Sequence, residues 1–180
     1  MSKTYRYFII LVILVYPLLS QECKHKEQRV SRQEFTEVRK TFTKINKVLV
    51  DQDRSLIEGY IKRHNLDGMK ESGTGLYYLV WGNSNDSLAK VGDVVEYSFR
   101  VSLLDGTLCY QTDSSNPKKF RVGKGGVESG VEQAVQLMRR GQKGKFILPP
   151  HLAYGLQGDL KMIPPRSIIV YDIEMLNVYH

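Results

Sequence analysis

Residues 141–178 constrain the fold more than any other part of the chain. Residues 145–148 have the composition of a short strand, which Pro149-Pro150 must end because proline offers no N–H to a sheet. Residues 168–175 are dense in β-branched and aromatic side chains, a pattern that predicts a strand buried on at least one face. The segment therefore predicts two strands joined by a long loop.

The loop between these strands is apolar and is bounded by prolines at both ends. It contains Tyr154, Leu160, Met162 and Ile163 between Pro150 and the Pro164-Pro165 pair. A loop of this composition more often forms a pocket wall than a solvent-exposed spacer. The sequence therefore predicts that the loop lines a binding pocket.

The residues before this segment predict the rest of the domain. Residues 94–103 indicate a long strand, and Asp105-Gly106 is a tight-turn signal that joins it to residues 108–110 as a hairpin. Residues 130–140 carry an apolar stripe typical of a helix. The predicted fold class is α+β, an antiparallel sheet of about five strands wrapped on one helix, and the cleft between them is the expected pocket.

Several motifs in these residues occur in an order that resembles one family. They are Val91-Gly92-Asp93, Asp105-Gly106-Thr107, residues 120–124 and 130–135, Ala153-Tyr154-Gly155, Ile163-Pro164-Pro165 and residues 171–176. On these motifs residues 92–180 resemble an FKBP-type peptidyl-prolyl cis-trans isomerase. The resemblance implies an FKBP-like fold, no cofactor, and proline-containing segments of exported proteins as substrates.

The resemblance also implies which residues form the site. Tyr154 matches the tyrosine whose hydroxyl holds a substrate carbonyl, Tyr97 forms one wall, and Tyr171 stands where the family usually has phenylalanine. The remaining pocket residues that it implies are Val127, Glu128, Val131, Met162, Ile163, Cys109 and Tyr110. No catalytic nucleophile is expected, because isomerisation rotates a peptide bond without forming a covalent intermediate.

The chain departs from the family pattern at several of these positions. Cys109-Tyr110 replaces a Phe-Asp pair, Val131 replaces a tryptophan or leucine at the pocket floor, and Asp159 replaces a histidine. Asp113 is a candidate substitute for the lost acid. We therefore expect weak isomerase activity and poor macrolide binding, and the alternative function is an inactive FKBP-fold chaperone or assembly subunit of the cell envelope.

The first 23 residues predict an export segment. Lys3 and Arg6 precede an apolar run over residues 7–19, which is short for a membrane-spanning helix. Cys23 follows, and its position resembles a bacterial lipoprotein site, although Glu22 fits such a site poorly. Lipidation at Cys23, an uncleaved membrane anchor and ordinary cleavage all remain open. Each places the chain at a membrane or in the periplasm. With the altered Phe-Asp pair, these features resemble the gliding-motility-associated lipoprotein isomerases of bacteria.

Residues 24–71 predict a helical arm. Phe35, Val38, Phe42, Ile45 and Leu49 share one stripe, and a second helix is expected to start at Asp51 or Asp53. Such stripes must be covered, so the helices pack on each other, on the domain, or on a second copy in a homodimer. Residues 72–91 then predict a first strand and a linker before the domain at residues 92–180.

Charge and histidine positions argue against other classes of function. The formal net charge is +7, but residues 81–180 carry twelve lysines and arginines against ten acids, so no nucleic-acid partner is expected. The histidines at positions 25, 64, 151 and 180 lack the spacing of metal ligands, so no metal site is expected.

Overall fold

The computed structural model describes residues 31–180. Contacts within the chain define two units, Met1–Lys44 and Ile45–His180, and the second contains every strand. Helix α2 (Arg32–Arg63) begins in the first unit and ends in the second. The elements that follow are β1 (Lys70–Glu71), β2 (Tyr77–Trp81), β3 (Val94–Leu103), β4 (Leu108–Gln111), β5 (Lys118–Arg121), α3 (Ser129–Gln136), β6 (Lys143–Leu148), the 3-10 helix η1 (Pro150–Leu152) and β7 (Ile169–Tyr179).

The strands form one antiparallel sheet in the order β1-β2-β6-β7-β3-β4, and β5 also pairs with β3. The α+β class predicted from the sequence is confirmed. The sheet has seven strands because residues 70–81 add β1 and β2 next to β6. Its long central strands are β3 and β7, which pair from Val94↔Tyr179 to Leu103↔Ile169.

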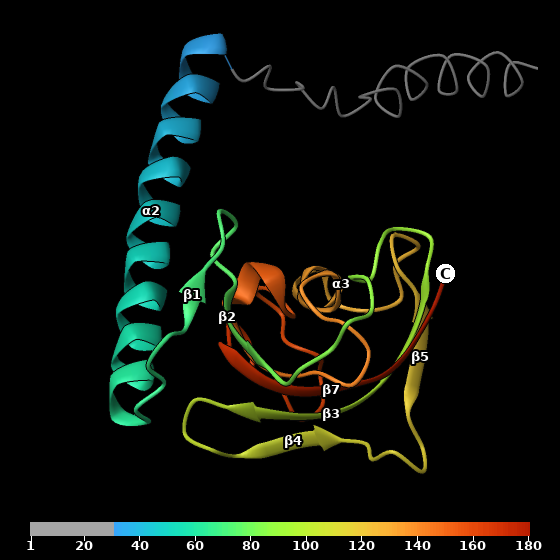
Figure 1. Ribbon diagram of the computed structural model, residues 1–180. Helices are drawn as coiled ribbons and strands as arrows, with labels where there is room; N and C mark the ends of the chain where they lie inside the picture. The colour runs from blue at the N-terminus through green and yellow to red at the C-terminus, as the bar shows by residue number, and fades with distance from the viewer. Residues whose placement is uncertain (1–30) are drawn as a thin grey trace, which may run out of the picture. The chain divides into compact units, whose positions relative to one another are not determined.

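Helix α3 lies inside the curve of the sheet, as Figure 1 shows. Its residues Val131, Ala134 and Val135 are buried in the same core as the inward-facing side chains of β3, β6 and β7. The helix is shorter than the 130–140 span expected from the sequence. The amides of Leu137 and Met138 bond three residues back, to Ala134 and Val135, which tightens the last turn and ends the helix.

Residues 32–63 of the arm form one helix where the sequence predicted two. No glycine or proline interrupts residues 49–55, and helix α2 continues through them. Asp53 was expected to cap a second helix, but its carboxylate accepts a hydrogen bond from Arg166 at 2.8 Å instead. The prediction of a second helix that starts at Asp51 or Asp53 is therefore wrong.

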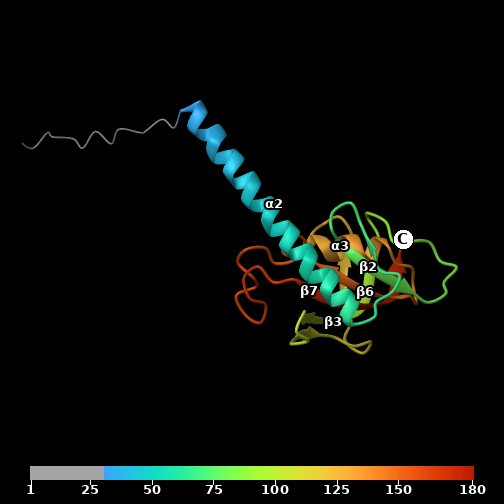
Figure 2. The ribbon, with the colours of Figure 1, turned by 90° about the vertical axis from the view of Figure 1, so that its left-hand side faces the viewer.

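The last turns of α2 pack on the outer side of the sheet (Figure 2). Ile57 and Tyr60 are buried in a second cluster that includes Tyr77, Ile147 and Val170. Arg166 extends this contact by donating to the Leu49 carbonyl at 3.0 Å. The sheet therefore holds one core on its α3 side and a smaller one beneath α2.

The first turns of α2 expose the apolar stripe that the sequence predicted. The side chains of Phe35, Val38 and Phe42 are 64%, 50% and 61% exposed. Within residues 31–180, no helix has an apolar stretch long enough to cross a membrane. The predicted export segment and Cys23 lie outside the described residues.

Candidate active site

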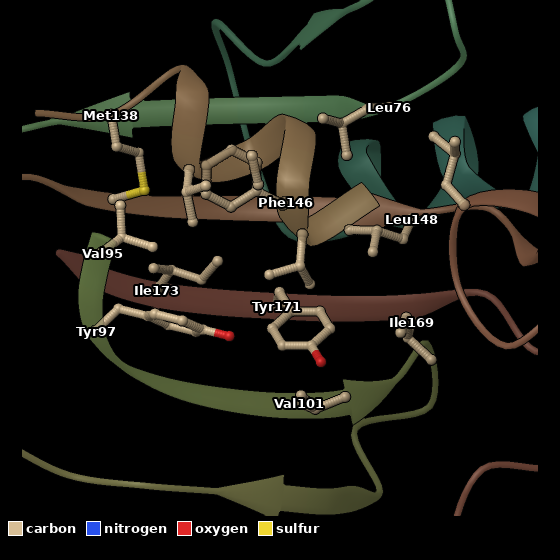
Figure 3. Packing of buried hydrophobic residues seen from close by; sticks show 14 of the residues in the cluster. Leu76, Val95, Tyr97, Val101, Met138, Phe146, Leu148, Ile169, Tyr171 and Ile173 are labelled. Carbon is tan, nitrogen blue, oxygen red and sulfur yellow. The ribbon is translucent and has the colours of Figure 1, made fainter. Parts of the chain in front are cut away.

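Two tyrosines on neighbouring strands form the buried wall of the site. Tyr97 on β3 is 1% exposed and Tyr171 on β7 is 3% exposed. Because Val101 pairs with Tyr171, and Tyr97 lies four residues before Val101, both rings lie on the α3 side of the sheet. Figure 3 shows them next to each other. Phe99 lies between them, with ring centroids 5.8 Å from Tyr97 and 5.7 Å from Tyr171.

Tyr154 reaches the same core from the loop after β6. Pro149 ends the strand and Pro150 begins η1, so the chain turns sharply and places Tyr154 against the core beneath α3. Burial raises the pKa of Tyr154, and the neighbouring Glu128 carboxylate raises it further. Burial and the same carboxylate raise the pKa of Tyr97 and of Tyr171. All three phenols are therefore protonated at neutral pH and are able to donate hydrogen bonds.

Glu128 contributes a carboxylate to this group of tyrosines. It precedes α3 as its N-cap residue, but its side chain makes no capping hydrogen bond. Its Oε2 atom is buried and has no hydrogen-bond partner within residues 31–180. The family resemblance implied only rim contacts for this residue. Its carboxyl group is close enough to Tyr97, Tyr154 and Tyr171 to raise the pKa of each phenol.

Glu132, which the sequence analysis did not select, positions the loop that leads to Val127 and Glu128. Its Oε1 accepts hydrogen bonds from the amides of Gly123 at 3.2 Å and Gly125 at 3.1 Å. Its place in the first turn of α3 brings its carboxylate next to this loop. Val127 is partly buried against the core, and Val131 is fully buried beneath it.

Tyr110 on β4 and Asp159 on the late loop form a hydrogen-bonded pair. The Tyr110 hydroxyl donates to Asp159 Oδ2, while Oδ1 accepts from the amides of Lys161 at 2.9 Å and Ile163 at 2.8 Å. The acid expected after the hairpin is thus found across the site, on the late loop. Asp113 does not replace it, because its carboxylate caps its own turn at Ser115 and Asn116.

The remaining pocket residues differ in exposure. Ile163 is 2% exposed and belongs to the core, whereas Met162 is 50% exposed. Cys109 is buried, and its Sγ lies 3.7 Å from the Met162 carbonyl oxygen. Among the residues implied by the resemblance, the structure brings Tyr97, Tyr154, Tyr171 and Glu128 together, while Tyr110 and Cys109 support the late loop.

A cleft of about 580 Å³ lies between α2 and the segment that carries Tyr154. It is lined by apolar side chains that include Leu49, Ile57, Pro150 and Leu156. The hydroxyl of Tyr77, also in the lining, is buried without a hydrogen-bond partner in the described part of the chain. Its volume falls in the range of pockets that bind small ligands or peptide segments.

An antiparallel sheet curved around one short helix, with aromatic side chains gathered between them, defines the fold of the FKBP-like isomerases. The sequence pattern of the family described as FKBP-type peptidyl-prolyl cis-trans isomerase matches residues 85–176, just over half of the 180-residue chain. The chain belongs to this family.

Relatives and solved structures agree with this assignment. The FKBP-type peptidyl-prolyl cis-trans isomerase FkpA of Escherichia coli is 36% identical over 115 residues, which are 62% of this chain and 40% of the relative. FK506-binding protein 2 of Yarrowia lipolytica is 36% identical over 91 residues, which are 50% of this chain and 63% of that protein. The chain thus matches less than two thirds of either relative.

Two solved structures resemble the fold. The crystal structure of FkpA from Escherichia coli superposes with a TM-score of 0.63 at 27% identity, covering 97% of this chain and 82% of that one. The crystal structure of a peptidyl-prolyl cis-trans isomerase from Pseudomonas syringae has a TM-score of 0.63 at 25% identity, covering 74% of this chain and 96% of that one.

Proposed function

We propose that the chain is a peptidyl-prolyl cis-trans isomerase that acts on proline-containing segments of exported proteins. The observation that supports this most strongly is the convergence of Tyr97, Tyr154 and Tyr171 beside α3 in a member of the FKBP-type family. These residues come from three separate segments, and each keeps its phenol protonated.

The chemistry requires binding and desolvation but no covalent step. Rotation about an X–Pro bond breaks amide resonance against a barrier of about 18–20 kcal/mol, and it takes roughly 10–100 s without a catalyst. The twisted amide has lost resonance, so a buried aromatic surface stabilises it relative to the planar form. Tyr97, Phe99 and Tyr171 supply that surface, and the Tyr154 hydroxyl donates to the substrate carbonyl.

Replacement of Tyr154 by phenylalanine tests this proposal. We expect Tyr154→Phe to lower kcat/KM for a proline tetrapeptide about 3- to 10-fold, because one neutral hydrogen bond contributes roughly 0.5–1.5 kcal/mol. A protease-coupled or NMR exchange assay measures the rate. Tyr179→Phe, at a tyrosine that is 48% exposed and bonds Glu96, is the matched control. If the unmodified chain does not raise the isomerisation rate above the uncatalysed rate, the proposal is contradicted.

The cleft beside α2 favours a second candidate function, a non-catalytic chaperone that holds apolar segments of unfolded chains. Its lining is mainly apolar. A Leu156→Glu variant discriminates the two candidates, because Leu156 is 74% exposed at the cleft and lies outside the aromatic wall. If the chain is a chaperone, Leu156→Glu should suppress aggregation less well than the unmodified chain. The isomerisation rate of a short peptide should not change.

Export and lipidation at Cys23 are further parts of the proposal, and only the sequence of residues 1–23 supports them. A Cys23→Ser variant is expected to lose incorporation of labelled fatty acid and to leave the membrane fraction. Unchanged fractionation of this variant argues for an uncleaved anchor. Release of the unmodified chain from membranes argues for ordinary cleavage.

Homodimer formation through the helical arm is also proposed. It is supported by the exposed stripe of Phe35, Val38 and Phe42 on α2. Analytical ultracentrifugation of a Phe35→Ser, Phe42→Ser variant tests it. A monomeric state of the unmodified chain at high protein concentration contradicts it.

A further inference from the structure

The cleft of about 580 Å³ beside α2 is formed in part by the same segment that carries Tyr154. Pro150, Gly155 and Leu156 line this cleft, whereas Tyr154, which lies among them in the chain, packs against the core beneath α3. Residues 46–57 of α2 supply another wall of the cleft. One stretch of chain therefore contributes to the cleft and to the tyrosine site.

The charged side chains in the lining are already paired within the protein. Arg54 forms a salt bridge with Glu71 at 2.9 Å, and Arg166 forms one with Asp53 at 2.8 Å. The imidazole of His151, also in the lining, donates from Nε2 to a backbone carbonyl at 2.9 Å. A charged ligand would have to compete with one of these pairs, so the lining suits an apolar, uncharged ligand.

The lining also contains backbone groups that suit a polypeptide. Gly73 and Leu156 belong to two separate segments of the lining. Neither the amide N–H nor the carbonyl of these two residues forms a backbone hydrogen bond within residues 31–180. A peptide backbone brings a donor and an acceptor with every residue except proline, whereas a purely apolar ligand brings neither. The lining therefore favours a peptide with apolar side chains over other apolar ligands.

We propose that the cleft binds an apolar, uncharged segment of the same polypeptide whose proline occupies the tyrosine site. The inference rests on the proposed isomerase function and names its substrate class, unfolded chains in which an apolar segment lies close to the proline. A spacer of about three or four extended residues spans roughly 10–14 Å, enough to pass around one stretch of chain. Binding at the cleft then raises the effective concentration of the proline at the tyrosines.

A set of extended peptides tests the proposal on the full chain. Each peptide joins Ala-Leu-Pro-Phe through a glycine–serine spacer to a tail of Leu-Val-Leu, Ser-Gly-Ser or Lys-Ser-Lys, placed before or after the proline. We expect the apolar tail to raise kcat/KM about tenfold over the serine–glycine tail on at least one side, and the lysine tail to give no gain. The gain should lie in KM, because the tail binds equally before and during rotation. Equal kcat/KM for apolar and serine–glycine tails on both sides overturns the inference.

Variants in two walls of the cleft locate the effect. Val50→Glu on α2 and Leu156→Glu after η1 each place a charge in the lining, at side chains that are 46% and 74% exposed. We expect each variant to reduce the ratio of apolar to serine–glycine tail to within about twofold. Val91→Glu introduces the same charge at a 70% exposed valine outside the lining and should keep the tenfold ratio. A tenfold ratio in both cleft variants, with folding checked by a thermal melt, overturns the assignment to the cleft.

Competition separates this inference from the proposed activity. The proline-free peptide Ser-Leu-Val-Leu-Ser should inhibit isomerisation of the peptide with the apolar tail but not of the tetrapeptide Ala-Leu-Pro-Phe. Its binding is followed independently of catalysis by NMR shifts of residues 49–57 and 155–156. Shifts at these residues in a chain without isomerase activity refute the proposed function and leave the peptide site in the cleft standing. Isomerase activity without an effect of the apolar tail refutes the inference alone.

Discussion

Tyr110 on β4 donates to Asp159 on the late loop, and this pair stands where the resemblance implies an acid directly after the hairpin. Asp159 in turn accepts the amides of Lys161 and Ile163, so one carboxylate organises the late loop. Burial opposes ionisation of Asp159, but the bonds from Tyr110 and the two amides outweigh it, and the pKa of Asp159 is lowered. The Tyr110–Asp159 pair therefore holds the loop beside Ile163.

Removal of the Tyr110 hydroxyl is expected to loosen this loop. In Tyr110→Phe, amide hydrogen exchange of residues 156–163 should become faster while that of β3 and β7 stays slow, because only the loop depends on the bond to Asp159. Tyr78→Phe, on β2, provides a matched control on another strand. If amide exchange in the loop is unchanged, the hydrogen bonds from the Lys161 and Ile163 amides to Asp159 hold the loop without Tyr110.

Hydrogen exchange in the same loop should depend on pH, and the pKa of Asp159 gives the direction of the change. The pKa of Asp159 is below its ordinary value of 3.8, so the stabilisation from its ionised form is present above that pH. It is lost as the pH falls through the lowered pKa. Hydrogen exchange of residues 156–163 should therefore accelerate in acid earlier for Tyr110→Phe than for the unmodified chain.

At the scale of the elements, the position of helix α3 depends on a close contact at Gly130. A Cβ added to Gly130 would lie 2.5 Å from Leu148 Cδ2 and 2.8 Å from the Leu152 carbonyl oxygen. The absent side chain lets the first turn of α3 approach β6 and η1 closely. Since Glu128 precedes this turn and Tyr154 follows η1, the contact sets the distance between the two sides of the site.

Gly130→Ala is expected to push α3 away from β6 and η1. Overpacking of this kind destabilises a fold by about 1–3 kcal/mol, and kcat/KM should fall as well because Glu128 and Tyr154 move apart. Chemical denaturation and the tetrapeptide assay measure both effects. Gly73→Ala is the matched control, since no atom lies within 4 Å of its added Cβ. Equal stability of the two variants contradicts the proposed role of Gly130.

At the scale of the whole molecule, the second unit extends beyond the isomerase-like residues to the last turns of α2. Ile57 is 1% exposed beneath them, and Arg166 joins the helix to the loop before β7 through Asp53 and the Leu49 carbonyl. Asp53 is itself 8% exposed, and Arg166 forms a salt bridge with its carboxylate. Residues 45–63 of the helix are therefore an integral part of the unit and close one side of the cleft.

Arg166→Met should leave the Asp53 carboxylate buried without its partner. We expect a loss of about 1–3 kcal/mol in the free energy of unfolding. Faster hydrogen exchange is expected in residues 49–63 before the sheet is affected. Lys143→Met, which removes a salt bridge to Glu174 between two exposed side chains, is the control and should change stability by less than about 1 kcal/mol. Equal effects of the two variants contradict an anchoring role for Arg166.

The sequence by itself determined the class of fold, and the aromatic residues of the wall were named by its resemblance to the family. Strand periodicity, the Pro149-Pro150 stop and the order of the motifs act locally, so the positions of β3, β6 and β7 followed from them. The roles of Tyr97, Tyr154 and Tyr171 remain predictions, although the structure brings them together.

Only the tertiary structure decided which polar groups meet. Tyr110 and Asp159 are 49 residues apart, and Asp53 and Arg166 are 113 residues apart, so no local pattern relates them. The role of Asp53 was also decided there, because the loop before β7 supplied Arg166 as a partner for an aspartate that resembled a helix cap. Hydrogen bonds and ion pairs between distant segments depend on how the chain packs, so they cannot be predicted from the periodicity of the sequence.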